Sequence, residues 1–93
     1  MTNNQPDDSK LKAVEFLEQG IALGISEKYE DAIRAFDKAI EINPDYALAW
    51  YNKGIALDNL GKYQEAINAY DKAIEIDPKD ASAWYNKGNA LFT

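Results

Sequence analysis

The sequence contains neither cysteine nor histidine, and these two absences exclude several common forms of side-chain catalysis. Without cysteine the chain has no disulfide framework and no thiol nucleophile. Without histidine it lacks the commonest general base, the serine–histidine pair and the usual zinc ligand. These absences lower the expectation of catalysis and direct attention to the surfaces of the protein.

Basic residues and long apolar runs are scarce as well. Ten Lys and Arg stand against 16 Asp and Glu, for a formal net charge of −6, whereas nucleic-acid binders carry a basic face. No apolar run reaches the length of a membrane span, and residues 1–10 lack the hydrophobic segment of a secretory signal. We therefore expect no nucleic-acid partner, no membrane partner and an intracellular, cytoplasmic location.

The acidic residues are numerous, but they do not form a convergent pair. Asp37 recurs as Asp71 and Glu41 as Glu75 at the same interval, which indicates equivalent outer positions of successive units rather than two groups facing one substrate. The segment 77–80 also lacks the ligand spacing of a calcium loop. We predict that the chain is not an enzyme and uses no cofactor or metal.

A repeat of 34 residues runs through almost the whole chain. Lys28 and Tyr29 recur as Lys62 and Tyr63, and most of the segment 28–44 is copied in 62–78. The other recurring positions are Phe16, Trp50 and Trp84, and Gly20, Gly54 and Gly88. A fixed period of this size is typical of arrays in which each unit stacks on the next.

The residues at the repeated positions resemble those of the tetratricopeptide repeat, from about Leu11 onward. In the second unit they are Trp50, Gly54, Tyr63, Ala66, Tyr70, Ala73 and Pro78. The resemblance implies an all-α fold, an α-solenoid of antiparallel helix–turn–helix repeats coiled into a right-handed superhelical array. The expected units are 13–46, 47–80 and a half repeat or capping helix at 81–93, within a domain 10–93 that follows a disordered lead at 1–9.

Five helices are expected, at about 10–25, 29–42, 47–60, 63–76 and 81–92. Ala32, Phe36 and Ala39 follow helical spacing. Pro44 and Pro78 are expected to end the second and fourth helices, because the residue before proline avoids helical geometry. Gly61 is expected to end the third with a positive φ. Gly20 and Gly54 should allow close approach of the partner helix, facing Tyr29 and Tyr63.

The resemblance also implies a concave groove, lined by the first helix of each unit, that holds a peptide. Helix geometry predicts a groove formed by Val14, Leu17, Ile21, Ile25, Leu48, Tyr51, Ile55, Asn59, Tyr85 and Asn89, with Ser82 and Phe92 on the same face of the last helix. The resemblance adds Asn52 and Asn86 to this groove. These residues favour an apolar or amphipathic segment, and the tyrosines suit a half-hydrated interface. An aspartate at position 17 is expected to damage the groove while leaving the fold intact.

The best-known groove of this family grips acidic chaperone tails with Lys, Asn and Arg. The corresponding positions here are Leu17, Ile21, Asn52, Ser82 and Asn86, which include no cation. Together with the negative net charge, this argues against an acidic tail as the ligand.

Self-association is the alternative hypothesis. Trp84, Gly88, Leu91 and Phe92 would form an apolar surface at the last helix, whereas terminal units of such arrays normally present a polar outer face. A homo-oligomer could form through this surface or between it and the first helix. A capping helix, a fragment of a longer array and a designed protein without a natural ligand all remain compatible with the sequence.

Overall fold

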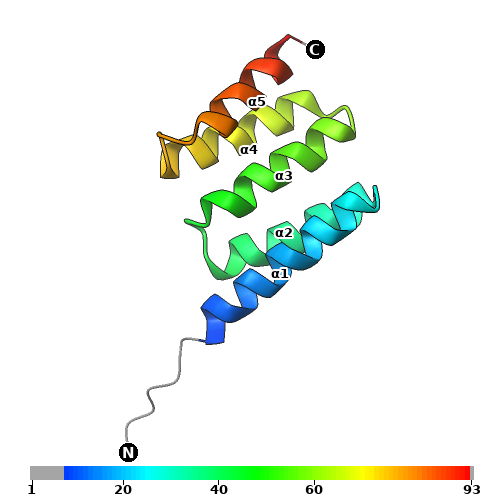
Figure 1. Ribbon diagram of the computed structural model, residues 1–93, viewed down its shortest axis with the longest axis vertical. Helices are drawn as coiled ribbons and strands as arrows, with labels where there is room; N and C mark the ends of the chain where they lie inside the picture. The colour runs from blue at the N-terminus through cyan, green and yellow to red at the C-terminus, as the bar shows by residue number, and fades with distance from the viewer. Residues whose placement is uncertain (1–7, 93) are drawn as a thin grey trace, which may run out of the picture.

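The computed structural model describes residues 8–92, which form five α-helices stacked one after another along the molecule (Figure 1). The helices are α1 (Asp8–Ile25), α2 (Tyr29–Ile42), α3 (Ala47–Asn59), α4 (Tyr63–Ile76) and α5 (Ala81–Leu91). Short turns join them, so that α1 packs on α2, α2 on α3, α3 on α4 and α4 on α5. The described residues contain no strand. The all-α helix–turn–helix repeat fold predicted from the sequence is confirmed.

The helix boundaries differ from the prediction mainly at the N-terminus. α2 and α4 have the predicted bounds, while α3 and α5 each end one residue earlier than predicted. α1 begins at Asp8, so Asp8 and Ser9 are helical and do not belong to a disordered lead. A carboxylate in the first turn favours this earlier start, because it complements the positive end of the helix dipole. The remainder of the predicted lead, residues 1–7, lies outside the described residues.

The turns inside the two helical hairpins have the same geometry but different residues. Gly61 has a φ of 78°, as predicted, and Glu27 occupies the equivalent position in the first hairpin with a φ of 63°. In both turns the next backbone N–H reaches back to close the helix end: Lys62 donates to the Leu57 carbonyl at 2.9 Å and Lys28 to the Leu23 carbonyl at 2.8 Å. Only Gly61 adopts this left-handed conformation without steric cost.

Small residues form most of the core and bring the helices close together. The buried alanines are Ala13, Ala32, Ala35, Ala39, Ala49, Ala56, Ala66, Ala69, Ala73, Ala83 and Ala90. Phe36 and Tyr70 are the large aromatic side chains buried among them. Gly20 and Gly54 do permit close helix approach, but the rings they face are Phe36 and Tyr70, not Tyr29 and Tyr63. The mid-helix aromatics lie at the crossing of the two helices, and this explains the difference.

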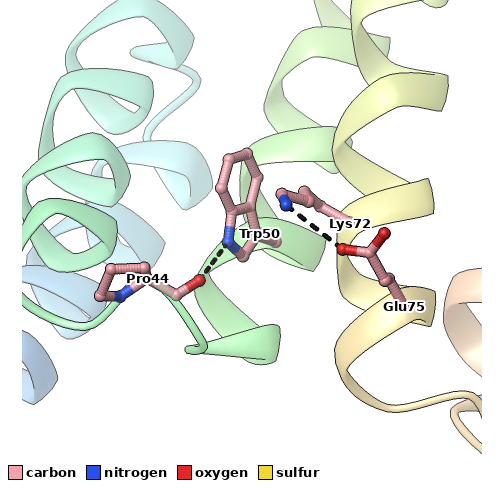
Figure 2. Close-up of polar contacts among 4 residues, drawn as sticks. All are labelled: Pro44, Trp50, Lys72 and Glu75. Carbon is pink, nitrogen blue, oxygen red and sulfur yellow. Dashed lines mark hydrogen bonds and ion pairs between the residues drawn. The ribbon is translucent and has the colours of Figure 1, made fainter.

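A tryptophan near the start of α3, and another near the start of α5, forms a hydrogen bond to the loop that precedes the helix. The Trp50 Nε1 donates to the Pro44 carbonyl at 2.9 Å (Figure 2), and Trp84 makes the same bond to Pro78 at 2.9 Å. The Lys72 ammonium lies 6.0 Å from the centre of the Trp50 ring. This repeated hydrogen bond fixes how α3 follows the first hairpin and how α5 follows the second.

Ion pairs join successive units at matching positions. Lys53 on α3 pairs with Asp37 on α2 at 2.7 Å, and Lys87 on α5 pairs with Asp71 on α4 at 2.7 Å. The two aspartates are therefore period-related, as the sequence indicated, and each contacts the next unit. A pair of this kind, half exposed to water, contributes modestly to stability.

Candidate ligand-binding groove

The first candidate site is an apolar pocket between α1 and α3, which we term the α1–α3 pocket. It encloses about 230 Å³. Its lining residues are Gly20, Ile21, Gly24, Ile25, Tyr29, Phe36, Asn52, Ile55, Ala56 and Asn59. Three isoleucines dominate it, and two of them, Ile21 and Ile25, have 36% and 79% of their surface exposed. A pocket with this lining favours an aliphatic side chain over a charged one.

The second candidate site repeats the first one unit further along the chain, and we term it the α3–α5 pocket. It also encloses about 230 Å³, and its lining residues are Ile55, Asp58, Asn59, Tyr70 and Asn86. These positions are equivalent to Ile21, Gly24, Ile25, Phe36 and Asn52 of the α1–α3 pocket. The fold therefore places a pocket at the same repeat position twice, with Ile55 and Asn59 shared between the two.

The two pockets differ in polarity at three positions. Gly24, Ile25 and Phe36 in the first correspond to Asp58, Asn59 and Tyr70 in the second. The buried Tyr70 hydroxyl donates to Asp58 Oδ2 at 3.4 Å. Burial raises the pKa of the Tyr70 phenol well above its ordinary value, and the charge of Asp58 raises it further. The α3–α5 pocket thus presents a carboxylate where the α1–α3 pocket presents only hydrocarbon and backbone.

Two tyrosines outside this polar pair differ in their surroundings. Tyr51 packs against Tyr70 with ring centroids 6.0 Å apart. Burial also raises the pKa of Tyr46, with a smaller contribution from the charge of Glu18. Tyr46 packs against the core of the first hairpin, so it does not contribute to either pocket.

The groove asparagines use their amide groups for bonds within the protein. Asn52 Nδ2 donates to the Leu48 carbonyl at 2.8 Å and Asn59 Nδ2 to the Ile55 carbonyl at 2.9 Å. Asn86 Nδ2 instead donates to the Tyr51 hydroxyl at 2.7 Å. Each of these amide groups carries a second N–H and an Oδ1 acceptor in addition to the bond described.

Leu17 is not a groove residue, contrary to the sequence-based expectation. Only 4% of its surface is exposed, and it packs in the core with Phe36 and Ala39. Its successors at the same repeat position are the half-buried Tyr51 and the 71% exposed Tyr85. An aspartate at position 17 would consequently bury an unpaired charge and disturb the fold, rather than the groove alone.

The structure brings together part of the predicted groove. Of the predicted groove residues, those that line the two pockets are Ile21, Ile25, Asn52, Ile55, Asn59 and Asn86, and Tyr51 touches the last of these. Val14, Leu48, Tyr85 and Asn89 are exposed and line neither pocket. Sequence reasoning missed Gly24 and Asp58, although each lies three residues after a predicted groove isoleucine, which is a spacing that shares a helix face.

The predicted self-association residues Trp84 and Leu91 are exposed on α5, and Phe92 is exposed directly after its last residue. The exposed fractions are 51% for Trp84, 60% for Leu91 and 93% for Phe92. Gly88 has no atom within 4 Å of the position a Cβ would occupy, whereas the equivalent Gly20 and Gly54 each face an aromatic ring. Among the described residues, no helix packs on this face of α5 as α2 packs on α1.

Neither a metal-binding cluster nor a membrane-crossing helix occurs between residues 8 and 92. No group of three or more His, Cys, Asp or Glu side chains there is arranged to hold a metal ion. None of the helices in that range is both long and apolar enough to cross a membrane.

Comparison with known proteins places the chain in a family. The sequence profile of the tetratricopeptide repeat matches residues 17–81 and 59–93. The chain is a member of the tetratricopeptide repeat family. It is also 39% identical, over 46 residues, to an uncharacterised protein of Methanocaldococcus jannaschii, and the match covers 50% of this chain and 54% of that protein. The chain thus spans about half the length of this relative.

Solved structures of tetratricopeptide repeat domains superimpose closely on the described helices. The Arabidopsis OM64 TPR domain has a TM-score of 0.86 at 26% identity and covers 88% of this chain and 68% of its own. The second TPR of Spaghetti (RPAP3), bound to the HSP90 peptide SRMEEVD, has a TM-score of 0.88 at 27% identity, with 91% and 79% coverage. The yeast Sti1 TPR2B domain in its pHsp70 complex has a TM-score of 0.86 at 30% identity, with 88% and 66% coverage. Domains of this family act as protein-interaction scaffolds.

Proposed function

We propose that this protein binds a peptide segment of another protein in the groove formed by α1, α3 and α5, and that the segment is apolar or amphipathic. The α1–α3 pocket carries the proposal, because it places three isoleucines around about 230 Å³ of accessible space. The complexes of Spaghetti with an HSP90 peptide and of Sti1 with pHsp70 support it, since domains with similar folds are the binding partners there. A shallow site of this kind is expected to bind in the micromolar range, with a free energy of about −8 kcal/mol.

The chemistry of the groove argues against the acidic peptide seen with Spaghetti as the ligand of this chain. The positions expected to hold a carboxylate include no cation, and Leu17 among them is buried. The α3–α5 pocket instead contributes the carboxylate of Asp58. A formal net charge of −6 adds repulsion of an acidic tail at long range.

Calorimetric titration of capped apolar peptides into the wild type and Ile25→Asn tests the proposal. Asparagine stands at the equivalent position 59, so the fold accommodates it, and the substitution removes apolar lining from the pocket. We expect saturable binding by the wild type and about tenfold weaker binding by the variant. Val14→Asn, on the same helix but outside both pockets, is the matched control and should bind as the wild type does. No saturable binding, or equal affinities, would contradict the proposal.

Self-association through α5 is a second candidate function. The observation that favours it is the open space at Gly88 within residues 8–92, beside the exposed Trp84 and Leu91. A second copy that covers these side chains would gain about 1.5–3 kcal/mol for each one fully buried. This surface lies on α5 and its interaction requires no peptide.

Light scattering over a concentration series distinguishes the two functions. We expect the mass of the wild type to rise with concentration and that of Leu91→Asp to remain monomeric. Leu48→Asp is the control, because Leu48 is 49% exposed on α3 and away from this surface. A wild-type mass that stays monomeric up to millimolar concentration would rule self-association out.

A further inference from the structure

We infer that the groove recognises two side chains at once: an aliphatic side chain in the α1–α3 pocket and a lysine or arginine in the α3–α5 pocket, beside Asp58. This inference rests on the proposed peptide-binding function and specifies the chemistry of the ligand. It follows from the differences between two pockets that the repeat would otherwise make identical.

The α1–α3 pocket has the features of an aliphatic subsite. Ile21, Ile25 and Ile55 face it, and its lining includes no charged residue. Gly24 keeps it open, because the site of a Cβ at this residue has no atom within 4 Å. A lysine placed here would lose water without gaining a partner, and this loss disfavours it.

The α3–α5 pocket has a carboxylate that the protein itself does not neutralise. Asp58 accepts a hydrogen bond from Tyr70, which carries no positive charge, and no cation lines the pocket. The lysines of the two flanking helices are engaged elsewhere: Lys53 pairs with Asp37 and Lys87 with Asp71. A lysine or arginine from a ligand would therefore supply the missing charge complement.

The spacing of the two ligand side chains follows from the spacing of the helices. The two pockets follow α1, α3 and α5, and α1 contacts α3 as α3 contacts α5. Helices in contact lie about 8–10 Å apart, and an extended peptide advances about 3.3 Å per residue. An extended ligand that crosses from one pocket to the next therefore places the aliphatic and basic residues about three positions apart. Either chain direction satisfies this geometry, so both orders of the two residues belong in the test.

Titration calorimetry with short capped peptides tests the pairing. One peptide carries leucine and lysine about three positions apart, and its partner carries the same residues in reverse order. Two matched peptides replace lysine by glutamate or leucine by alanine. We expect the better leucine–lysine peptide to bind about three to ten times more tightly than either matched peptide. Equal binding of the lysine and glutamate peptides would overturn the inference while leaving the proposed function in place.

Two substitutions test the acidic side chain: one removes it from the α3–α5 pocket, and the other adds it to the α1–α3 pocket. Asp58→Asn keeps the side-chain shape and should lose most of the preference for the lysine peptide over the glutamate peptide, keeping only the part that the negative net charge produces. Gly24→Asp gives the α1–α3 pocket the acid of its counterpart, and the space at Gly24 accommodates it; a peptide with lysine in place of leucine should then gain affinity. Asp45→Asn makes the same charge change at an exposed turn and should retain the wild-type preference.

These variants also separate the two possible failures. If Asp58→Asn retained the full lysine preference, or if Asp45→Asn lost as much of it as Asp58→Asn does, general electrostatic attraction rather than the pocket would be responsible, and the inference would be wrong. If no peptide bound to the wild type, the proposed function itself would fail. Circular dichroism of each variant verifies that the helical fold is present in the proteins compared.

Discussion

The Tyr70 ring packs directly against the α-carbon of Gly54, so that a Cβ at residue 54 would lie 2.5 Å from Tyr70 Cε1. Phe36 and Gly20 have the same relationship in the first hairpin, where the corresponding distance is 2.4 Å. These contacts set the closest approach of the two helices in each hairpin. Gly88 occupies the same repeat position on α5 and has no aromatic neighbour.

Alanine substitutions at these glycines are expected to have opposite effects. Gly54→Ala forces the buried Tyr70 ring to move, and overpacking of this kind costs about 1–3 kcal/mol. Gly88→Ala meets no atom and gains helix propensity, which stabilises the fold by up to about 1 kcal/mol. Urea unfolding followed by circular dichroism measures both. If the two variants had equal midpoints, the close contact at residue 54 would not limit the packing.

The turn residue Glu27 is expected to be a site of strain. It has a φ of 63° at the position that Gly61 occupies in the second hairpin. A side chain in this left-handed conformation costs about 1–2 kcal/mol, so Glu27→Gly should raise the free energy of unfolding by about 1 kcal/mol after the greater flexibility of the unfolded chain is included. Glu30→Gly, which places glycine inside α2, is the control and should lower it. A destabilised Glu27→Gly variant would refute the strain argument.

The repeat made most of the fold predictable. Each helix contains apolar residues at helical spacing. The residue type of Gly61 alone indicates the turn between α3 and α4. The start of α1 was harder to predict. Asp8 and Ser9 are polar, so they do not extend the apolar spacing, although the helical backbone of α1 includes them. The partners of Gly20 and Gly54 depended on where the helices cross, which a one-dimensional pattern does not specify.

The candidate site was predictable only in part, because burial depends on the neighbouring unit. Helix geometry placed Leu17, Tyr51 and Tyr85 on one face, but their exposure rises from 4% at the first to 71% at the last. Asp58 could be found from its spacing to Ile55, yet its importance appears only when the structure places it beside Tyr70. The outer positions of a repeat follow from the sequence, whereas the pocket that they form requires the packed array.

Core and groove positions on α1 are expected to respond differently to substitution. Leu17→Ala removes buried side-chain volume next to Phe36 and should cost about 2–5 kcal/mol. Ile25→Asn changes a residue that is 79% exposed and should change stability by less than about 0.5 kcal/mol. Thermal unfolding of the two variants makes the comparison. Similar losses of stability would show that Ile25 also supports the core, and its use as a binding probe would then be invalid.

The Tyr70 phenol is expected to make the fold sensitive to alkaline pH. Its pKa is raised in the folded state by burial and by Asp58, so the fold favours the neutral phenol. The resulting stabilisation is present below the ordinary tyrosine pKa of about 10 and is lost as the pH rises through the higher folded-state value.

Tyr70→Phe removes this dependence and, because the bond to Asp58 is long, should cost only about 0.5–1 kcal/mol at neutral pH. The melting temperature of the wild type should therefore fall more steeply above about pH 10 than that of Tyr70→Phe, whereas the exposed Tyr85→Phe control should follow the wild type. Superimposable profiles for the wild type and Tyr70→Phe would show that Tyr70 ionises equally well in the folded and unfolded chains.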